Sequence, residues 1–413
     1  MYINKKKVYN NKDKISRNGK LYNIGIINRS ESNKEKYKMC ENKNFNKVLL
    51  MNVESFVDSM EMTSLIKEEL LAKLIKYEYC RENNLNSFDY NTKDLKDNEF
   101  NSHLVGFIDG DGYIKTGKRV GHKKGYYRIV PHITIELSNK NERYLNLIIK
   151  KIFLENKKVH NRIDRSIAVI DIRSKEELNK IMGIIDGNNG FISEKKSKDY
   201  IKFKELLNYL DITKEELHGE AWVNKGMEIW SENIILEDRE TREKGLNYIN
   251  KNLTINYLLG FIEAKGLLKL QKQNANKYIN SFELKSTDND LILDGILEFI
   301  KNYKDPLYIV KDIDLGDQKV SLKRSKKNVW SSLLIDNEDI LYYKIIPMLL
   351  STNMYTKMEL NLVNFILGVV ICKYLKDIPE CKKLYIKIKD SITNNELLNL
   401  NEVLLVLNKY LKK

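Results

Sequence analysis

Two long stretches of the chain share one pattern of apolar positions, first at helical spacing and then at the alternating spacing of strands. In each stretch an apolar helix precedes strand-like segments, a polar turn, an amphipathic helix and further short strand-like runs such as SIAVIDIR and KVSLKR. A final helix closes each stretch. The pattern predicts two units of the order helix-strand-strand-helix-strand-strand-helix, or αββαββα, in the α+β class.

Three blocks of sequence recur in the same order in these two stretches. The first block reads HLVGFIDGDGYIK from His103 to Lys115 and YLLGFIEAKGLLK from Tyr257 to Lys269. The other blocks pair residues 133–152 with 281–300 and residues 181–203 with 345–365. Because all three repeat in order, we interpret the chain as an internal duplication of one folding unit.

The duplication divides the chain into four parts. We expect a first lobe at residues 96–210, a charged and mostly helical linker at 211–254, and a second lobe with C-terminal helices at 255–413. Residues 1–95 form an N-terminal extension, which we expect to be partly disordered because its first 45 residues are rich in Lys, Asn and Ser. Residues 53–81 within the extension are predicted to be helical.

The first block resembles the signature of the LAGLIDADG family of homing endonucleases and group I intron maturases. Leu104 to Gly112 read LVGFIDGDG, and Leu258 to Gly266 read LLGFIEAKG, which looks like a degenerate second copy. The resemblance covers roughly residues 100–370. It implies two pseudo-symmetric lobes with antiparallel, saddle-shaped sheets that are joined along the two motif helices and bind nucleic acid on the sheets.

Small residues four positions apart in each motif predict how the two helices meet. Gly106 with Gly110, and Gly260 with Ala264, leave room for the helices to approach backbone to backbone. The apolar residues between them are expected to pack into the lobes. We therefore expect these four small residues to form the lobe interface.

The last residue of each motif helix, Asp111 or Lys265, is expected to reach the shared base of the two lobes. In the family this position holds an acid, and two such carboxylates bind Mg²⁺ ions that activate water for phosphodiester hydrolysis. Asp111 fits the role of metal ligand. Lys265 does not fit this role, because its ammonium would repel the metal ion. Each pair of like unit charges repels by roughly 4 kcal/mol at about 4 Å and an effective dielectric near 20.

The lysine at position 265 predicts severely reduced double-strand cleavage, since about 1.4 kcal/mol corresponds to a tenfold change in rate. Asp111 could still hold one ion and permit nicking, so Mg²⁺ is expected as a cofactor only if cleavage activity remains. Rescue by Glu263 is the alternative. This residue lies on a different helical face and, like Asp109, is expected to cap or orient the interface.

The resemblance also implies a basic residue near each scissile phosphate, within the third repeated block. Matching that block gives Lys196 and Lys357, which would stabilise the charge that develops on the phosphate. Lys195 is an alternative to its neighbour. Two solvated lysines without a catalytic role are the other interpretation of these positions.

The charge balance of the chain favours a polyanionic partner. Lys and Arg total 71 against 57 Asp and Glu, which gives a formal net charge of +14. Codon drift in an AT-rich genome is the alternative, because the chain is also rich in Asn, Ile and Tyr.

Local asymmetry is stronger evidence than net charge. The segment from Gly112 to Ile135 has no acidic residue and contains these basic ones: Lys115, Lys118, Arg119, Lys123, Lys124 and Arg128. In the second lobe the expected nucleic-acid-binding residues are Lys269, Gln271 and Gln273, which alternate with Leu268 and Leu270 that would pack inward. Donors on such a strand face can contact phosphates and base edges.

Other classes of protein are disfavoured by the residues that metals, disulfides and membranes require. The 4 cysteines contain no Cys-x-x-Cys pair, and the 5 histidines lack metal-ligand spacing, so neither a zinc ribbon nor a disulfide framework is indicated. We find no secretory signal and expect no membrane association.

The resemblance leaves more than one function open. Loss of one metal carboxylate with basic strands retained favours an intron RNA splicing maturase, or a related RNA-binding cofactor, with impaired DNA cleavage. The alternative is a site-specific homing endonuclease or nickase acting on double-stranded DNA, and a third candidate is a structural component of an RNA–protein assembly. Intron RNA, double-stranded DNA and a nuclear-encoded splicing factor are the expected partners, and the resemblance implies a monomer in the mitochondrial matrix.

Overall fold

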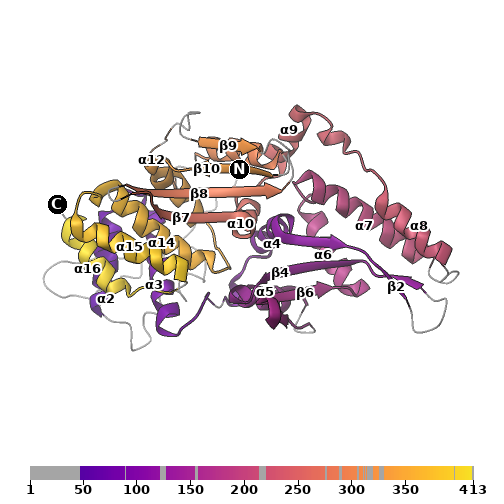
Figure 1. Cartoon of the computed structure of the whole chain (residues 1–413), viewed down its shortest axis with the longest axis horizontal. Coiled ribbons are helices and arrows are strands. Elements are labelled where there is room, and N and C mark those ends of the chain that lie inside the picture. Colours follow the sequence, from indigo (N-terminus) through magenta and orange to yellow (C-terminus); the bar gives the residue numbers. More distant parts are fainter. Residues whose placement is uncertain are drawn as a thin grey trace, which may run out of the picture. The chain divides into compact units, whose positions relative to one another are not determined.

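The computed structural model describes residues 47–88, 90–120, 127–153, 157–213, 220–274, 277–287, 291–304, 307–309, 311, 313, 320–324, 330–394 and 396–411 (Figure 1). These residues all lie within one compact unit that spans residues 46–413. The expectation of disorder in the first 45 residues falls outside the described part of the chain.

The first lobe has the predicted order of elements. Its helices and strands are α4 (Asp97–Asp111), β1 (Gly112–Lys115), β4 (His132–Ser138), α5 (Glu142–Ile148) with a short continuation η3 (Ile149–Phe153), β5 (His160–Arg162), β6 (Ile167–Ile172) and α6 (Lys175–Gly187). The strands form an antiparallel sheet in the order β1-β4-β6-β5. The helix α7 (Glu194–Ile212) follows α6 after a short loop.

The second lobe repeats this order. Its elements are α10 (Ile255–Lys265), β7 (Gly266–Lys272), β8 (Tyr278–Thr287), α11 (Ile292–Asn302), β9 (Val320–Arg324), β10 (Trp330–Ile335), the continuous helical segments α12 (Glu338–Ile340), η6 (Leu341–Ile345) and α13 (Ile346–Leu350), and α14 (Met358–Val370). The sheet order is β7-β8-β10-β9, which matches the first sheet strand for strand (Figure 1). The predicted pair of pseudo-symmetric αββαββα lobes is confirmed.

Local sequence explains where these elements begin and which face they bury. The side chain of Thr254 accepts a hydrogen bond from the amide of Tyr257 and so caps α10. Along β7 the side chains of Leu268 and Leu270 are buried, while Lys269 and Gln271 point to the open face of the sheet. The alternation that the sequence predicted for this strand is therefore confirmed.

The segment between the lobes does more than connect them. It contains α8 (Glu220–Ser231), η5 (Glu237–Arg239) and α9 (Arg242–Asn252). A ribbon of β2 (Lys118–Val120) and β3 (Tyr127–Ile129) extends from the first sheet, and Ile129 packs on Leu206 of α7 and on Trp222 and Val223 of α8. The helices α7 and α8 thus hold the ribbon in place.

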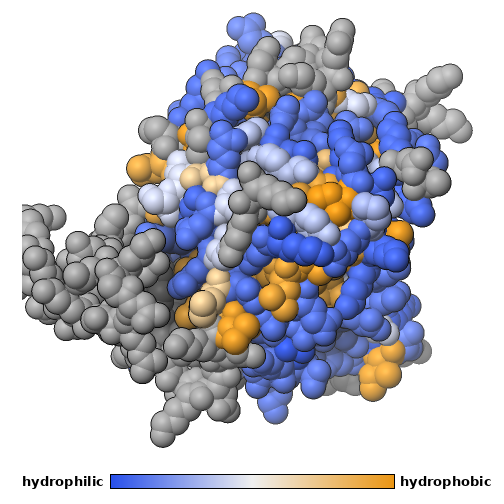
Figure 2. All heavy atoms as spheres, turned by 90° about the vertical axis from the view of Figure 1, so that its left-hand side faces the viewer, coloured by the Kyte–Doolittle hydropathy of each residue, from blue (hydrophilic) through white to orange (hydrophobic). Residues whose placement is uncertain are grey.

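The described part of the N-terminal extension packs on the second lobe. Its helix α2 (Lys47–Ser59) lies against the C-terminal helix α16 (Leu400–Leu411), and α3 (Ser64–Glu82) lies against α14 (Figure 1). The helix α15 (Pro379–Asn394) packs on α14 and α16. Tyr77 donates a hydrogen bond to Asn364 at 2.9 Å, and Asn52 donates to Asn401 at 2.7 Å. Figure 2 shows this end of the molecule, where the coloured surface is mostly hydrophilic with separate hydrophobic spots.

One helical stretch of the described residues, Met358–Leu375, is long and apolar enough to cross a membrane by length and composition. It comprises α14 and its continuation η7 (Ile371–Leu375), and 83% of it is buried inside the protein. The stretch therefore serves as the core helix of the second lobe.

Candidate nucleic-acid interface and its central site

The two motif helices, α4 and α10, cross in direct backbone contact between the lobes. A Cβ atom added to Gly106 would lie 2.0 Å from the carbonyl oxygen of Tyr257, and one added to Gly260 would lie 1.9 Å from that of His103. Gly110 faces Ala264, with 2.5 Å between an added Cβ and the alanine Cβ. The structure thus brings the four small motif residues together in one crossing, which only glycine and alanine can fill.

Asp111 and Lys265 emerge side by side at the ends of the two motif helices. The Lys265 ammonium donates a hydrogen bond to Asp111 Oδ1 at 3.3 Å, and both side chains are about 30% exposed, at 27% and 32%. Burial raises the pKa of the Asp111 carboxyl above its ordinary value, and the charges of Lys265 and Lys196 offset only part of this effect. The ends of the two motif helices therefore carry an aspartate and a lysine in direct contact.

Lys196, near the start of α7, reaches the same point from the first lobe. Its ammonium donates a hydrogen bond to the carbonyl oxygen of Gly112, the residue that follows Asp111. Burial lowers the pKa of Lys196, and the nearby charge of Lys265 adds to this effect, while Asp109, Asp199 and Asp111 oppose it. The first lobe thus supplies one carboxylate and one lysine to the centre.

Asp109 holds the loop that precedes α7. It is 4% exposed and accepts hydrogen bonds from the amides of Ile192 and Ser193 at 3.1 and 2.9 Å, and from the Ser193 hydroxyl. The hydroxyl of Tyr257, from the motif helix of the other lobe, donates to the same carboxylate at 2.5 Å. The interface and the loop before Lys196 are therefore joined through one buried acid.

Glu263 makes the same arrangement in the second lobe. Its fully buried carboxylate accepts from the amides of Tyr355 and Thr356 at 2.9 and 2.8 Å, and from the Thr356 hydroxyl at 2.8 Å. His103 Nε2, from the first motif helix, lies 2.6 Å from Glu263 Oε2. The expectation that Asp109 and Glu263 orient the interface is confirmed, because each carboxylate ties its own loop to the opposite helix.

The comparisons with known proteins identify this arrangement. A family model described as LAGLIDADG endonuclease matches residues 104–207, which cover the first motif helix, its sheet and the helix that carries Lys196. The first lobe is thus similar to the LAGLIDADG endonucleases. The chain's second motif helix is the degenerate copy, with Lys265 at the acid position.

One curated relative is a probable intron-encoded endonuclease, Cox1-I1b, of Schizosaccharomyces pombe. It is 27% identical over 212 residues, which cover 49% of this chain and 50% of that protein. The chain thus spans about half the length of the curated relative it matches.

Solved LAGLIDADG structures share the two-lobed fold. The I-LtrWI homing endonuclease bound to target DNA superposes with a TM-score of 0.55 at 19% identity, covering 75% of this chain and 99% of that one. I-GzeII in complex with a DNA target gives 0.56 at 15% identity, covering 70% and 97%. I-SmaMI bound to uncleaved DNA in the presence of calcium ions gives 0.54 at 17% identity, covering 71% and 98%.

The two lobes do not carry lysines at matching positions of the third block. The hydrogen bonds of the two buried acids align Ser193 with Thr356, so Lys196 aligns with Glu359, and Lys357 aligns with Glu194. Pairing Lys357 with Lys196 from the sequence was therefore wrong by two positions.

Lys357 instead lies beside the first lobe, where its amide donates to Asn141 Oδ1 at 2.9 Å. Burial, with the charge of Lys140, lowers the pKa of Lys357 to about 8.

Each of the two loops has a further support from outside the repeated unit. In the first lobe, the Arg239 guanidinium from the linker donates to the carbonyl oxygens of Ile192 and Phe191 at 2.9 and 3.1 Å. In the second, Glu359 is buried with the ammonium groups of Lys73 and Lys76 from the extension, at 3.3 and 3.2 Å.

Tyr90 completes the second support. Its hydroxyl lies 2.8 Å from both Glu359 oxygens and from the carbonyl oxygen of Met354. The segment that carries Tyr90 also contacts the first lobe, since Arg143 of α5 donates to the carbonyl oxygen of Ser87 at 3.1 Å.

The basic residues expected on the first lobe occupy two places. Lys115 lies on β1 of the sheet, whereas Lys118, Arg119 and Arg128 lie on the β2–β3 ribbon, and Lys123 and Lys124 lie outside the described residues. Lys118 pairs with Glu220 of α8 at 3.1 Å. Arg119 and Arg128 stand directly opposite each other across the ribbon, a like-charge pair that an anionic ligand would stabilise.

The open face of the second sheet carries the remaining predicted residues. Lys269 and Gln271 lie on β7, and Gln273 begins the turn to β8, where its amide donates to the carbonyl oxygen of Lys277 at 2.8 Å. Lys269 pairs with Glu283 on the neighbouring strand. The acidic residues Glu136, Asp171 and Glu283 stand among the basic ones on the two sheets, so these faces are less uniformly basic than the sequence predicts.

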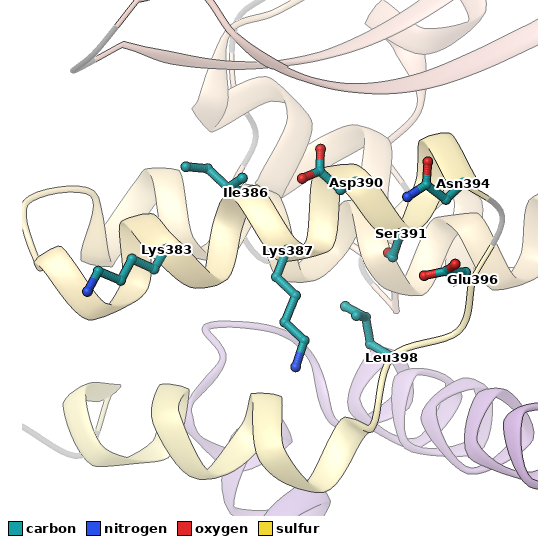
Figure 3. Close-up of a pocket in the computed structure, with 8 residues that line it drawn as sticks. All are labelled: Lys383, Ile386, Lys387, Asp390, Ser391, Asn394, Glu396 and Leu398. Atoms are coloured by element: carbon teal, nitrogen blue, oxygen red, sulfur yellow. The ribbon is translucent and has the colours of Figure 1, made fainter.

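A separate groove of about 370 Å³ lies between α15 and the segment leading to α16 (Figure 3). Its polar lining carries both signs of charge, from Lys383, Lys387, Asp390 and Glu396, and Lys387 pairs with Glu402 at 3.2 Å. The groove shares no residue with the central site.

Sequence reasoning did not find Tyr257, His103, Arg239 or Tyr90. The first two occupy the same position of the repeated motif, the residue before its first leucine, so their pairing across the interface could have been suspected. Nothing in the sequence points to Arg239 or Tyr90, because their partners lie far away in the chain.

Proposed function

We propose that this LAGLIDADG protein is an intron RNA splicing maturase, or a related RNA-binding cofactor, with impaired DNA cleavage. The observation that carries the proposal is the contact between Lys265 and Asp111 at 3.3 Å. The ammonium takes the place of the second acid and also engages the first one. Binding by the saddle does not depend on that acid, whereas two-ion hydrolysis does.

The residues at the centre fit a pair of divalent ions poorly. The partly open carboxylate of Asp111 is engaged by Lys265. Among the described residues, no group of three or more His, Cys, Asp or Glu side chains could hold a metal ion. A cation at this point would meet the repulsion of Lys265 and Lys196.

Paired cations support a role in binding a polyanion. Arg119 and Arg128 face each other on the ribbon, and the charge of Lys140 adds to the effect of burial in lowering the pKa of Lys357. Like charges at such distances are unfavourable unless a phosphate lies near them. We expect these residues, with Lys115, Lys269, Gln271 and Gln273, to contact the nucleic acid.

A nickase acting on double-stranded DNA is the second candidate. It is favoured by the retention of Asp111 and Lys196 in the first lobe, because one carboxylate and one lysine could assist attack on one strand. Double-stranded target DNA in the complexes of the structural relatives supports this partner class.

The intron-encoded relative supports an organellar setting, and we propose the mitochondrial matrix, a monomeric state and a nuclear-encoded splicing partner as further parts of this function. We also propose lobes at residues 96–210 and 255–413, with residues 211–254 as linker. Finding the protein outside mitochondria by cell fractionation would contradict the proposed location in the mitochondrial matrix.

The test of the maturase function is binding to the host intron RNA at several salt concentrations, together with its splicing in vitro. We expect preference over an unrelated RNA of equal length, and a fall in affinity with salt as phosphate contacts are screened. Equal affinity for both RNAs would contradict the proposal.

Cleavage is tested with Mg²⁺ and DNA that spans the intron insertion junction. Wild type should leave at least one strand intact, and Lys265→Glu should gain divalent-ion binding, measured by calorimetry with Ca²⁺, as well as cleavage. If wild type cuts both strands and Asp111→Asn abolishes the cutting, the protein is an endonuclease.

A further inference from the structure

The open face of the second sheet contains a groove. It has a volume of about 410 Å³, within the range of small-ligand sites, and is lined by Glu283, Lys285, Lys323, Trp330, Ser332 and Leu334. Strands β8, β9 and β10 supply all six residues, so the groove is built on the rigid sheet.

Strand register explains why these side chains converge. Ser332 on β10 stands opposite Lys285 on β8 and Lys323 on β9, and Trp330, two residues earlier, points to the same face. Trp330 is 46% exposed although it is a large aromatic residue. An indole face is therefore held in the open between two lysines, at diagonal distances within reach of long side chains.

The floor of the groove is a carboxylate. Glu283 Oε1 accepts a hydrogen bond from Ser332 at 3.0 Å and lies 3.5 Å from Lys285, and Oε2 accepts from Lys269. Burial alone would raise the pKa of Glu283, but the hydrogen bonds from Lys269 and Ser332 lower it below its ordinary value. The group is thus a fixed, ionised acceptor with remaining lone pairs.

The first lobe has different residues at every matching position. Gly112 pairs with Ile135 and Gly266 with Leu284, so the groove residues correspond to Thr134, Glu136, His160, Ile167, Val169 and Asp171. These include no tryptophan, tyrosine or phenylalanine, and no lysine. The residues that line the groove are therefore not shared by the two lobes.

We propose that this groove binds an unpaired nucleobase that carries an exocyclic amino group, with Trp330 stacking on the base, Glu283 accepting from the amino group, and Lys285 and Lys323 contacting the flanking phosphates. Bases within a duplex are stacked on their neighbours, so an indole can stack only on a base that has left the helix. A carboxylate acceptor selects cytosine, adenine or guanine over uracil, which has no amino donor.

This inference rests on the proposed function, since unpaired bases are a feature of folded intron RNA, but it is tested separately. The probes are short single-stranded oligocytidylate and oligouridylate RNA, the deoxycytidylate strand, and its duplex with deoxyguanylate. The readout is tryptophan emission. Trp222 is buried in the α7–α8 cluster, so it serves as an internal reference for folding.

We expect oligocytidylate to quench the emission and to bind more tightly than oligouridylate, while the duplex leaves the emission unchanged. Trp330→Ala should remove the quenching and weaken binding by on the order of 10- to 100-fold, and Trp330→Phe should retain most of the affinity. Glu283→Gln should reduce the preference for cytosine over uracil. Ile167→Ala at the matching position of the first lobe is the control and should change neither quantity.

Four outcomes separate the hypotheses. Unchanged oligocytidylate affinity in Trp330→Ala overturns the groove assignment, even if the host intron RNA still binds preferentially. Equal quenching by the duplex also overturns it, because a paired base would then suffice. Quenching by oligocytidylate without any preference for the host intron supports the groove and contradicts the maturase function. Equal binding of the DNA and RNA strands supports recognition of the base rather than the sugar.

Discussion

The loops before α7 and α14 are held by the same arrangement of hydrogen bonds, but different residues support each loop from outside that arrangement. In both loops, a buried acid of the motif helix accepts hydrogen bonds from two backbone amides and a hydroxyl. A residue of the opposite motif helix contacts the same acid. Outside this common part, Arg239 of the linker braces the first loop, whereas Lys73, Lys76 and Tyr90 of the extension brace the second through Glu359.

The difference shows which parts of a duplicated scaffold are constrained. The motif helices approach closely, and both copies keep a glycine at the crossing and a buried acid that binds the loop. The outer supports need only fix a loop, so unrelated chemistry serves in each lobe. The residue type also differs between the lobes at the ends of the motif helices, where one lobe carries Asp111 and the other carries Lys265.

The largest expected effect comes from removing the support that only the second loop has. Glu359→Ala would leave Lys73 and Lys76 buried without their carboxylate, and breaking a buried ion pair costs about 3–5 kcal/mol. Urea unfolding monitored by circular dichroism measures this loss. Glu380→Ala, which removes an exposed pair with Lys409, is the control, and a similar loss in both variants would contradict the difference between the supports.

The next effect tests the part that the lobes share. In Gly260→Ala the new Cβ would meet the His103 carbonyl oxygen at 1.9 Å, so the helices must separate, at a cost of roughly 1–3 kcal/mol. Nucleic-acid binding should fall with stability, because the lobes no longer hold their relative position. Gly183→Ala, in a helix with open space around it, should instead stabilise the protein slightly, and equal destabilisation by both substitutions would contradict close packing as the cause.

A comparable effect tests the contact that Tyr257 makes across the interface. Tyr257→Phe removes one of the hydrogen bonds to the Asp109 carboxylate, and bonds to charged groups contribute roughly 1.5–3 kcal/mol. Thermal unfolding should register this loss. Tyr248→Phe, whose hydroxyl donates to the exposed Asn189 carbonyl oxygen, should cost less, and the reverse order would show that Tyr257 does not hold the loop.

The smallest effect concerns Lys357, which has no lysine partner at the matching position of the first lobe. Its pKa of about 8 means that its charge is lost as the pH rises through 8, and affinity for RNA should fall several-fold between about pH 7 and pH 9. Lys357→Arg keeps its charge and should flatten this profile in filter binding. Stability should change with the opposite sign, rising above pH 8, because the folded state binds its proton more weakly than the unfolded chain.

The fold was predictable because duplication made the same pattern visible twice. The positions of Asp111 and Lys265 followed from the motif, since a glycine after each residue ends the helix there. The strand register of the second repeated block was harder to predict from the sequence. Aligned from their first residues, the blocks place Ile135 beside Glu283, but the structure matches it to Leu284, and a shift of one residue exchanges the two faces of a strand.

The third block failed for a related reason. Its lysines were matched by their place in the block, but the register is set by which amides the buried acids bind. Such long-range hydrogen bonds leave no periodic signal. The supports from Arg239 and from Lys73 and Lys76 were invisible for the same reason, because each pairs residues from segments that look like ordinary charged helices.

The buried cluster around Glu359 also determines where this protein can be shortened. A fragment that starts at residue 96 would keep both motifs and both sheets and would look complete by homology. It would nevertheless leave Glu359 without Lys73, Lys76 and Tyr90, and would uncover the apolar side of α14. Recombinant versions intended to isolate the duplicated region should therefore begin before α2.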